Sequence, residues 1–139
     1  MWLGVNLLCA TGFVNAAVQA IDYCDLLTHP AFGLAYDAFH VHIKEKDQVQ
    51  AVTTLAWRIQ VLHLSEDDCG NPESGQVDFP AVFGAVKKTA FGGRGVLEAF
   101  GSGMPELAAA TRIRQPKFDD YNTLYSDSFR YLKDAWNPA

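Results

Sequence analysis

The chain has 139 residues, of which 49% are hydrophobic and 19% charged, and its formal net charge is −5. These proportions are typical of one globular domain and exclude a disordered chain. The acidic balance offers no basic surface to a phosphate backbone, which argues against nucleic-acid binding. The three cysteines show no C-x-x-C spacing, which favours a reduced, cytoplasmic setting.

The apolar N-terminal stretch resembles a secretory leader only in hydrophobicity. The first lysine or arginine of the chain is Lys44, so the positively charged start of a leader is missing. Gly4, Asn6 and Gly12 interrupt the stretch, and it is too short to cross a bilayer. We therefore expect a buried strand over residues 3–8 that runs into a helix.

Strand and helix signals alternate along the chain. We expect strands at 3–8, 34–36, 59–64 and 96–100, and helices at 13–27, 46–57, 79–88, 105–113 and 121–136. Asp78 is the predicted N-cap of the helix that ends near Lys88, with Pro80 in its first turn. This alternation predicts a single α/β domain built of βα units, with four parallel strands in sequential order.

Three ionisable residues, Asp37, His63 and Glu98, fall at or next to the carboxyl ends of expected strands. Ligands and catalytic groups gather at that end of a parallel sheet. Taken singly, Asp37 is equally a helix cap, and His63 is more often a core histidine than a ligand. Glu98 lies in the apolar run GVLEAF, where a buried carboxylate must be paired or bound. Together the three side chains predict a divalent-cation site.

The segments YDAFHVHIKE (36–45), HLSEDDCGNPESGQVDF (63–79) and GVLEAFG (95–101) resemble the sugar isomerase/epimerase branch of the xylose isomerase-like TIM barrels. The resemblance extends over essentially the whole chain and points to the D-tagatose 3-epimerase and D-psicose 3-epimerase group. It implies that residues 1–139 are the four C-terminal βα units of a partial (β/α)8 barrel. The implied activity is that of an isomerase or epimerase of ketose sugars, working by metal-assisted proton transfer next to a carbonyl.

The same resemblance implies roles for five residues. Asp37 and His63 correspond to metal ligands, and Glu98 to a ligand that doubles as the acid/base on one face of the sugar. His40 corresponds to a side chain that holds a substrate oxygen; the alternative is a partly exposed loop histidine. Glu66 corresponds to a residue that orients neighbouring groups behind the ligands. The implied ion is Mn²⁺, Co²⁺ or Mg²⁺.

Two positions depart from the family pattern. The family's second glutamate, at the end of the strand matching 3–8, has no counterpart, because no acidic residue precedes Asp22. Cys69 stands where the family carries an arginine, whose charge it cannot replace. We therefore expect weakened metal binding. Because a full barrel needs eight strands in about 250 residues, we also expect self-association through open strand edges. The alternatives are a catalytically inactive half-barrel and an assembly module, such as one half of a two-chain barrel.

Overall fold

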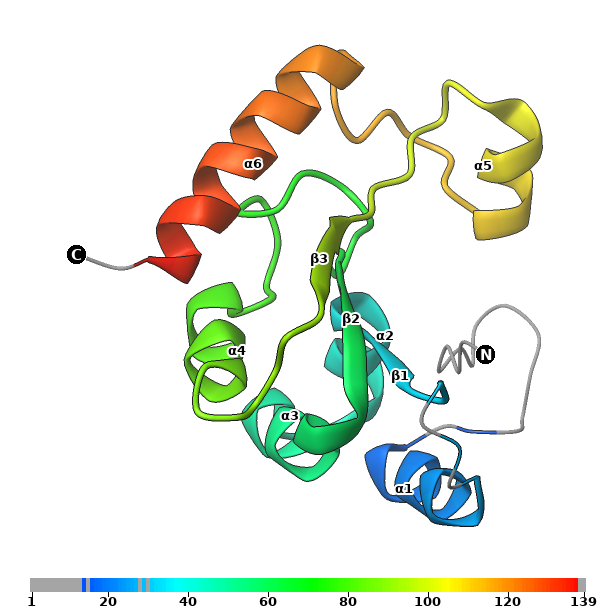
Figure 1. The fold of residues 1–139 in the computed structure, drawn as a ribbon. Helices are drawn as coiled ribbons and strands as arrows, with labels where there is room; N and C mark the ends of the chain where they lie inside the picture. The colour runs from blue at the N-terminus through cyan, green and yellow to red at the C-terminus, as the bar shows by residue number, and fades with distance from the viewer. Residues whose placement is uncertain (1–13, 15, 28, 30, 138–139) are drawn as a thin grey trace.

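The computed structural model describes residues 14, 16–27, 29 and 31–137, which form a parallel sheet covered on one face by helices (Figure 1). The three strands are β1 (Leu34–Asp37), β2 (Ile59–Leu64) and β3 (Arg94–Leu97), in the order β1-β2-β3 with parallel pairing. The helices are α1 (Ala17–Leu26), α2 (Ala38–Lys44), α3 (Gln48–Leu55), the 3₁₀ turn η1 (Ala56–Arg58), α4 (Phe79–Val86), α5 (Pro105–Thr111) and α6 (Tyr121–Trp136).

The sheet confirms the sequential parallel order for the strands that are described, and the expected strand at 3–8 lies outside the described residues. β2 has the expected bounds. The strand expected at 96–100 lies earlier in the chain: β3 begins at Arg94 and ends at Leu97. The pairing with β2 sets these bounds. The ladder runs from Val61↔Arg94 to Leu64↔Leu97, and β3 ends opposite Leu64, the last residue of β2.

Helix α2 was not among the helices expected from the sequence. Asp37 ends β1 and is also the N-cap of α2, since its Oδ1 accepts a hydrogen bond from the backbone N of His40 at 3.4 Å. The next helix begins in the same way, with Asp47 Oδ1 accepting from Gln50 N at 2.9 Å. Such caps satisfy amide donors that a helix start leaves free.

The later helices follow their sequence signals. Asp78 caps α4, with its Oδ1 2.9 Å from the backbone N of Ala81, as expected. Helix α4 ends at Val86, slightly before the expected end. Helix α6 has the expected bounds, and α5 ends at Thr111 because Arg112 adopts a left-handed backbone with φ of 60°. Within the described part of the chain, none of these helices combines the length and apolarity needed to cross a bilayer.

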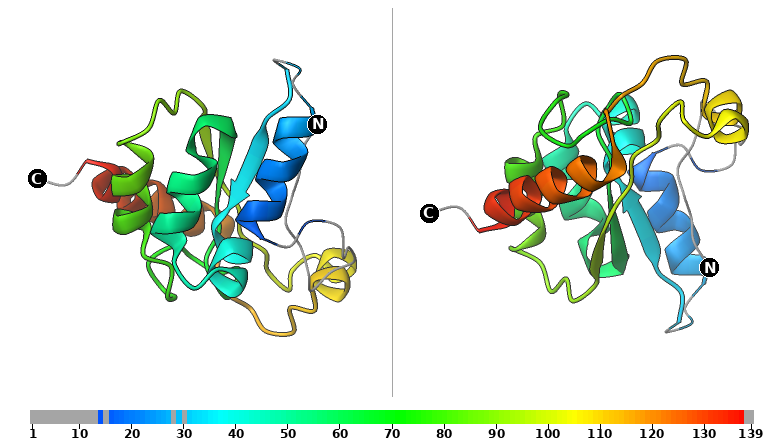
Figure 2. Two further views of the ribbon diagram at one scale, coloured as in Figure 1. Left: turned by 90° about the horizontal axis from the view of Figure 1, so that it is seen from below. Right: turned by 90° about the horizontal axis from the view of Figure 1, so that it is seen from above.

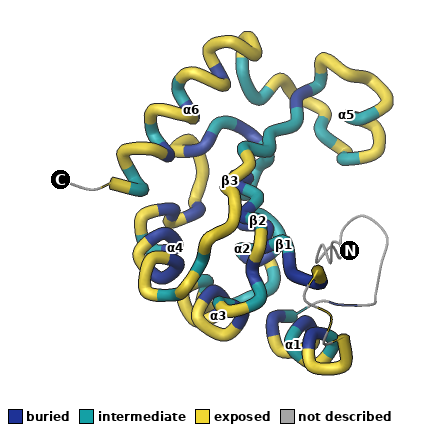
Figure 3. The backbone as a smooth tube through the Cα atoms, in the orientation of Figure 1, coloured by how far each residue is buried: buried dark blue, intermediate teal, exposed yellow. Residues whose placement is uncertain are grey.

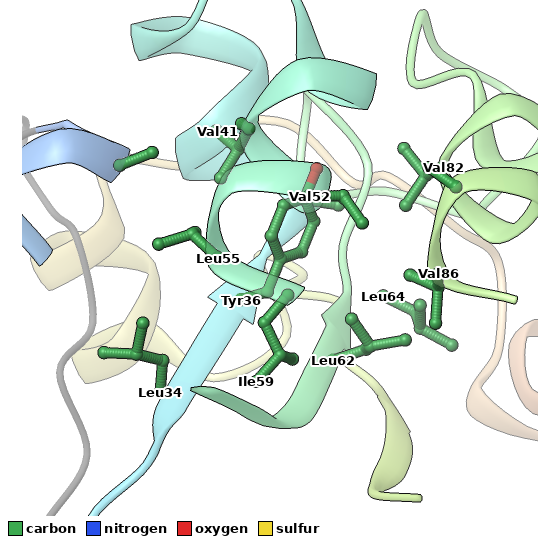
Figure 4. Close-up of a cluster of buried hydrophobic side chains, with 14 of the residues drawn as sticks. Leu34, Tyr36, Val41, Val52, Leu55, Ile59, Leu62, Leu64, Val82 and Val86 are labelled. Carbon is green, nitrogen blue, oxygen red and sulfur yellow. The ribbon is translucent and has the colours of Figure 1, made fainter. Parts of the chain in front are cut away.

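Helices α1, α3, α4 and α6 form a row in which each packs on the next, outside one face of the sheet (Figures 1 and 2). The side chains of β1 and β2 that point toward these helices pack against them and form the core. Figure 4 shows Leu34, Tyr36, Leu62 and Leu64 from the strands among helix side chains such as Val52. Fully burying an aliphatic side chain of this kind contributes roughly 1.5–3 kcal/mol.

Alternation along each strand sends its other side chains to the opposite, inner face of the sheet. Asp37 and His63 are register partners on that face, and Val96 of β3 pairs with His63. Val96 keeps 42% of its surface exposed, and the tube in Figure 3 marks much of β3 as exposed. The inner face therefore holds the ionisable residues, while the outer face holds the core.

Candidate metal and substrate site

The structure brings together the three residues that the sequence singled out. Asp37 ends β1, His63 lies beside it in β2, and Glu98 follows the last residue of β3, with its backbone N donating to Leu64 O at 3.3 Å. One ligand atom from each of the three lies within 4.8 Å of the others. Two carboxylate oxygens and one imidazole nitrogen at this spacing match the donor set of a hard or borderline divalent cation.

Asp37 is buried, at 8% exposure, and its two carboxylate oxygens differ in their contacts. Oδ1 accepts hydrogen bonds from Ser65 Oγ at 2.7 Å and from His40 N at 3.4 Å. Oδ2 faces two imidazoles, 3.7 Å from His40 Nε2 and 3.9 Å from His63 Nδ1. The cap and the candidate-ligand interpretations are therefore compatible, because Oδ1 caps the helix while Oδ2 points into the cluster.

Ser65 also contacts the cluster, although the sequence pattern did not single it out. It is 2% exposed, donates to Asp37 Oδ1, and accepts from the backbone N of Phe39 at 3.1 Å. These contacts fix the carboxylate rotamer of Asp37. A signal was present, since inner-face alternation from His63 reaches Ser65 two residues later.

His63 and Glu98 form a close pair, with Nδ1 2.5 Å from Oε2. The side chain of Glu98 is 25% exposed, so it is half-buried rather than enclosed in a strand, but it is paired as the sequence argument required. Burial raises the pKa of Glu98, the charge of Asp37 raises it further, and His63 opposes both effects. A raised carboxyl pKa is the property that an acid/base group near neutral pH needs.

His40 lies on α2 and not in a loop, and its side chain is 15% exposed. Burial lowers the pKa of His40, which outweighs the raising effect of Asp37, and the charge of His63 also lowers it. The Phe39 ring packs edge-on against the imidazole, with centroids 4.8 Å apart. A mainly neutral imidazole held in this way can donate or accept a hydrogen bond at the edge of the cluster.

Glu66 is fully buried and holds the loop that follows β2. Its Oε1 accepts from the backbone N of Val77 at 2.7 Å and of Asp67 at 3.1 Å. Oε2 has no hydrogen-bond partner among the described residues. Burial raises the pKa of Glu66, and the two backbone hydrogen bonds lower it. In this structure Glu66 organises the loop beside the cluster.

Cys69 occupies the turn of that loop with a φ of 61°. Its backbone N donates to Glu66 O at 2.9 Å, and its carbonyl accepts from Phe100 N at 2.8 Å. The loop after β2 is therefore joined to the segment just beyond Glu98.

A parallel βα sheet with carboxylate and imidazole groups at the carboxyl ends of its strands is the arrangement of a TIM-barrel active site. The model of the xylose isomerase-like TIM barrel family matches residues 4–135. The chain therefore belongs to the xylose isomerase-like TIM barrel family.

Curated relatives include a ketose 3-epimerase of Arthrobacter globiformis, 27% identical over 126 residues, which span 89% of this chain and 44% of that protein. An L-ribulose 3-epimerase of Methylomonas sp. (strain DH-1) is 23% identical over 91% of this chain and 45% of its own length. The chain spans less than half the length of these relatives.

Solved structures show the same fold. The D-allulose 3-epimerase from Methylomonas sp. in complex with D-allulose superposes with a TM-score of 0.84 at 24% identity, covering 90% of this chain and 44% of that one. D-Psicose 3-epimerase from Clostridium cellulolyticum H10, with D-tagatose, gives a TM-score of 0.83 at 18% identity over 91% and 45% of the two chains. The described residues are thus part of a TIM barrel.

Proposed function

We propose that residues 1–139 form the C-terminal half of a ketose 3-epimerase-type barrel and carry one half of its active site. The observation that carries this proposal is the convergence of Asp37, His63 and Glu98 within 4.8 Å at the mouth of the sheet. The relatives that the chain matches are named as 3-epimerases of ketoses, which supports a small ketose as the ligand.

In this proposal Asp37, His63 and Glu98 hold a divalent cation, with Mn²⁺, Co²⁺ and Mg²⁺ the best matches to mixed carboxylate and imidazole donors. The donor set fits, because Asp37 Oδ2 faces the cluster while Oδ1 is held by Ser65. A bound ion would supply Lewis-acid polarisation of the sugar's carbonyl and hydroxyl oxygens. Asp37 and His63 would then position this ion, and through it the sugar oxygens.

Glu98 is the proposed acid/base for one face of the sugar. Its carboxylate, half-buried at the mouth of the sheet, can take up the proton next to the carbonyl and return it. His40, beside Asp37, is proposed to hold a substrate oxygen. Glu66 keeps the loop after β2 in place over this site through Val77 and Asp67.

Epimerisation needs a base on each face of the reacting carbon, and among the described residues of the cluster we assign that role only to Glu98. No acidic residue precedes Asp22, so the strand expected at 3–8 brings neither a further ligand nor a second base. We therefore expect that these residues alone bind metal weakly and do not complete epimerisation. A catalytically inactive half-barrel or assembly module is the second candidate function, and this missing carboxylate favours it.

Two properties of the isolated chain complete the proposal. It self-associates through open strand edges, because β3 has only one strand partner among the described residues and is exposed along Arg94–Val96. It works in the cytoplasm, in keeping with three cysteines that show no C-x-x-C spacing.

Calorimetric titration of the chain with Mn²⁺ tests the site. Weak binding that His63→Ala abolishes is expected, while His42→Ala, on α2 outside the cluster, leaves it unchanged. Tight binding that survives His63→Ala would place the ion elsewhere. Wash-in of solvent deuterium at C3 of D-psicose then tests the activity: a slow exchange that Glu98→Gln removes supports the half-site, and turnover at an ordinary enzymatic rate would refute it.

A further inference from the structure

A pocket lies beside the metal cluster, between the loop that follows β2 and the connection from α5 to α6. Its volume of about 330 Å³ is within the range of roughly 300–1,000 Å³ that is usual for small-molecule sites. The loop contributes residues 67–69 to the lining, and the connection contributes residues 111–115 and Lys117. Phe39 also lines it, and the Phe39 ring packs against the imidazole of His40 with centroids 4.8 Å apart. The pocket therefore borders the cluster.

Two contacts hold the connection in this place. Lys117 Nζ lies 3.1 Å from Asp68 Oδ2, in an ion pair with the loop after β2. The ring of Phe118 lies against buried Gly101, where an added Cβ would come within 2.8 Å of it. Gly101 follows Glu98 by three residues. The connection is thus fixed at the end of the sheet where β2 and β3 finish (Figure 1).

The lining of the pocket has more positive than negative charges, although the chain is acidic. The net charge of the chain is −5, yet residues 107–118 contain two arginines and one lysine and no acidic residue. These three cations line the pocket together with only two carboxylates, Asp67 and Asp68. A local surplus of positive charge in a cleft raises the local concentration of anions.

Both carboxylates of the lining have partners of their own. Asp67 Oδ1 accepts from the backbone N of Gln76 at 3.0 Å, and Asp67 Oδ2 accepts from Gln76 Nε2 at 3.3 Å. Asp68 Oδ1 accepts from the backbone N of Gly70 at 2.7 Å, while Asp68 Oδ2 pairs with Lys117. The ion pair thus engages the lysine and leaves the two arginines.

The guanidinium groups of Arg112 and Arg114 form no hydrogen bond or ion pair with the described residues. Both residues are exposed, so a ligand that enters the pocket can reach them. A guanidinium presents a planar fork of donors that matches phosphate oxygens bidentately. Two such groups, two residues apart and without a carboxylate partner, match a phosphate dianion better than a neutral hydroxyl.

We infer that this pocket is a phosphate subsite and that the ligand of the chain is a ketose phosphate. The inference rests on the proposed function, because the sugar part of this ligand lies at the metal cluster. Its phosphate pairs with Arg112 and Arg114, and its sugar passes Phe39 to reach His40. Lys117 is a positioning residue, since its ion pair holds the connection that carries both arginines.

NMR titration of the whole ¹⁵N-labelled chain in EDTA tests the subsite, with D-fructose 1-phosphate, D-fructose 6-phosphate and D-fructose as ligands. One of the two esters should bind about tenfold or more tightly than the free sugar, and should shift the Nε–H signals of Arg112 and Arg114. The double substitution Arg112→Gln and Arg114→Gln should remove the preference. Arg94→Gln with Arg130→Gln removes the same charge at exposed positions outside the pocket and should keep it.

Inorganic phosphate separates a substrate subsite from a simple anion site. It should bind more weakly than the ester, because it lacks the sugar part. His40→Ala should weaken binding of the ester and leave that of inorganic phosphate unchanged, since His40 is expected to contact only the sugar. Circular dichroism of each variant checks that it folds.

Four results would overturn the inference: esters that bind no better than D-fructose, a preference that survives loss of both arginines, inorganic phosphate that binds as tightly as the ester, or equally tight binding of the keto acid D-fructuronate. The last would assign the pocket to carboxylates. Mn²⁺ titration reports separately on the cluster. Arginine-dependent ester binding without Mn²⁺ binding at His63 would refute the proposed function alone, and Mn²⁺ binding without ester preference would refute the phosphate subsite alone.

Discussion

His63 Nδ1 lies 2.5 Å from Glu98 Oε2, because His63 is in β2 and Glu98 directly follows the neighbouring parallel strand β3. Asp37 Oδ2 is 3.9 Å from the same nitrogen. The imidazole therefore lies between two carboxylates, one from each neighbouring element. Burial and the nearby charge of Asp37 raise the pKa of Glu98, and the contact with His63 opposes that rise without cancelling it.

Glu98→Gln should have opposite effects on stability with and without metal. The raised pKa means that ionised Glu98 favours the unfolded chain, so its stabilising contribution is present below its unfolded pKa and is lost as pH rises through the folded pKa. In EDTA at neutral pH the variant should unfold at a slightly higher temperature. In millimolar Mn²⁺ the metal-dependent increase seen for the parent should disappear. Thermal unfolding in the two buffers measures both effects, with the exposed Glu106→Gln as control. A variant that keeps its Mn²⁺-dependent increase would show that Glu98 is not a ligand.

Ser65→Ala should destabilise the chain and weaken its metal site. The substitution removes the hydroxyl that donates to Asp37 Oδ1 and accepts from Phe39 N in a buried position. The change leaves Phe39 N without its acceptor and leaves Asp37 Oδ1 with His40 N alone. A loss of this kind costs about 1–3 kcal/mol, which urea unfolding can measure. Ser74→Ala is the matched control, because Ser74 is exposed and bonds only a loop carbonyl, that of Asn71. Equal losses in the two variants would contradict the positioning role of Ser65.

Glu66→Gln should change how stability depends on pH. Because the pKa of buried Glu66 is raised from its ordinary value of 4.5, the folded state binds the proton more tightly than the unfolded state. Its stabilising contribution is therefore full below about pH 4.5 and is lost as pH rises through the folded pKa. The glutamine keeps an acceptor for Val77 N and Asp67 N without the charge.

The measurement is the free energy of unfolding in urea between pH 4 and pH 8. The variant should gain stability over the parent as pH rises, whereas Glu73→Gln, at an exposed position of the same loop, should follow the parent curve. Parallel curves for parent and Glu66→Gln would show that burial does not raise the pKa of this carboxyl.

The sequence predicted those elements whose local signals agree with their packing. β2 and α6 have the expected bounds, because IQVLHL is a short apolar run and α6 begins after the capping residue Asp120. Helix α2 was missed because it starts directly at the end of β1, with no turn residue between, and Asp37 serves both elements.

The cluster was predictable in part. Asp37, His63 and Glu98 lie at or next to the carboxyl ends of neighbouring strands, and parallel pairing brings such positions together. Ser65 was not recognised, since a serine after a strand is equally a turn residue. The pocket beside the cluster depends on where the connection from α5 to α6 packs, which local patterns do not encode.

Gly93→Ala should destabilise the fold much more than Gly92→Ala. A Cβ at Gly93 would overlap the carbonyl oxygen and carbon of Gln60 in the neighbouring segment of β2, and backbone atoms cannot move aside as a flexible side chain can. A Cβ at Gly92 would meet nothing within 4 Å. Forcing an extra methyl into a filled space costs about 1–3 kcal/mol, sometimes more, whereas alanine at an open position changes stability by about 0.5 kcal/mol or less.

The two glycines are a matched pair, because they are neighbours in one connection and both are exposed to solvent. Urea unfolding of the two variants gives the comparison, with the midpoint of Gly93→Ala expected well below that of the parent. The same substitution should also disturb pairing between Val61 and Arg94, where the ladder of β2 and β3 begins, and so weaken the Mn²⁺ binding that depends on Glu98. If Gly93→Ala unfolds at the parent's midpoint, the close approach of β3 to Gln60 is incorrect, and the register that places Glu98 beside His63 is incorrect with it.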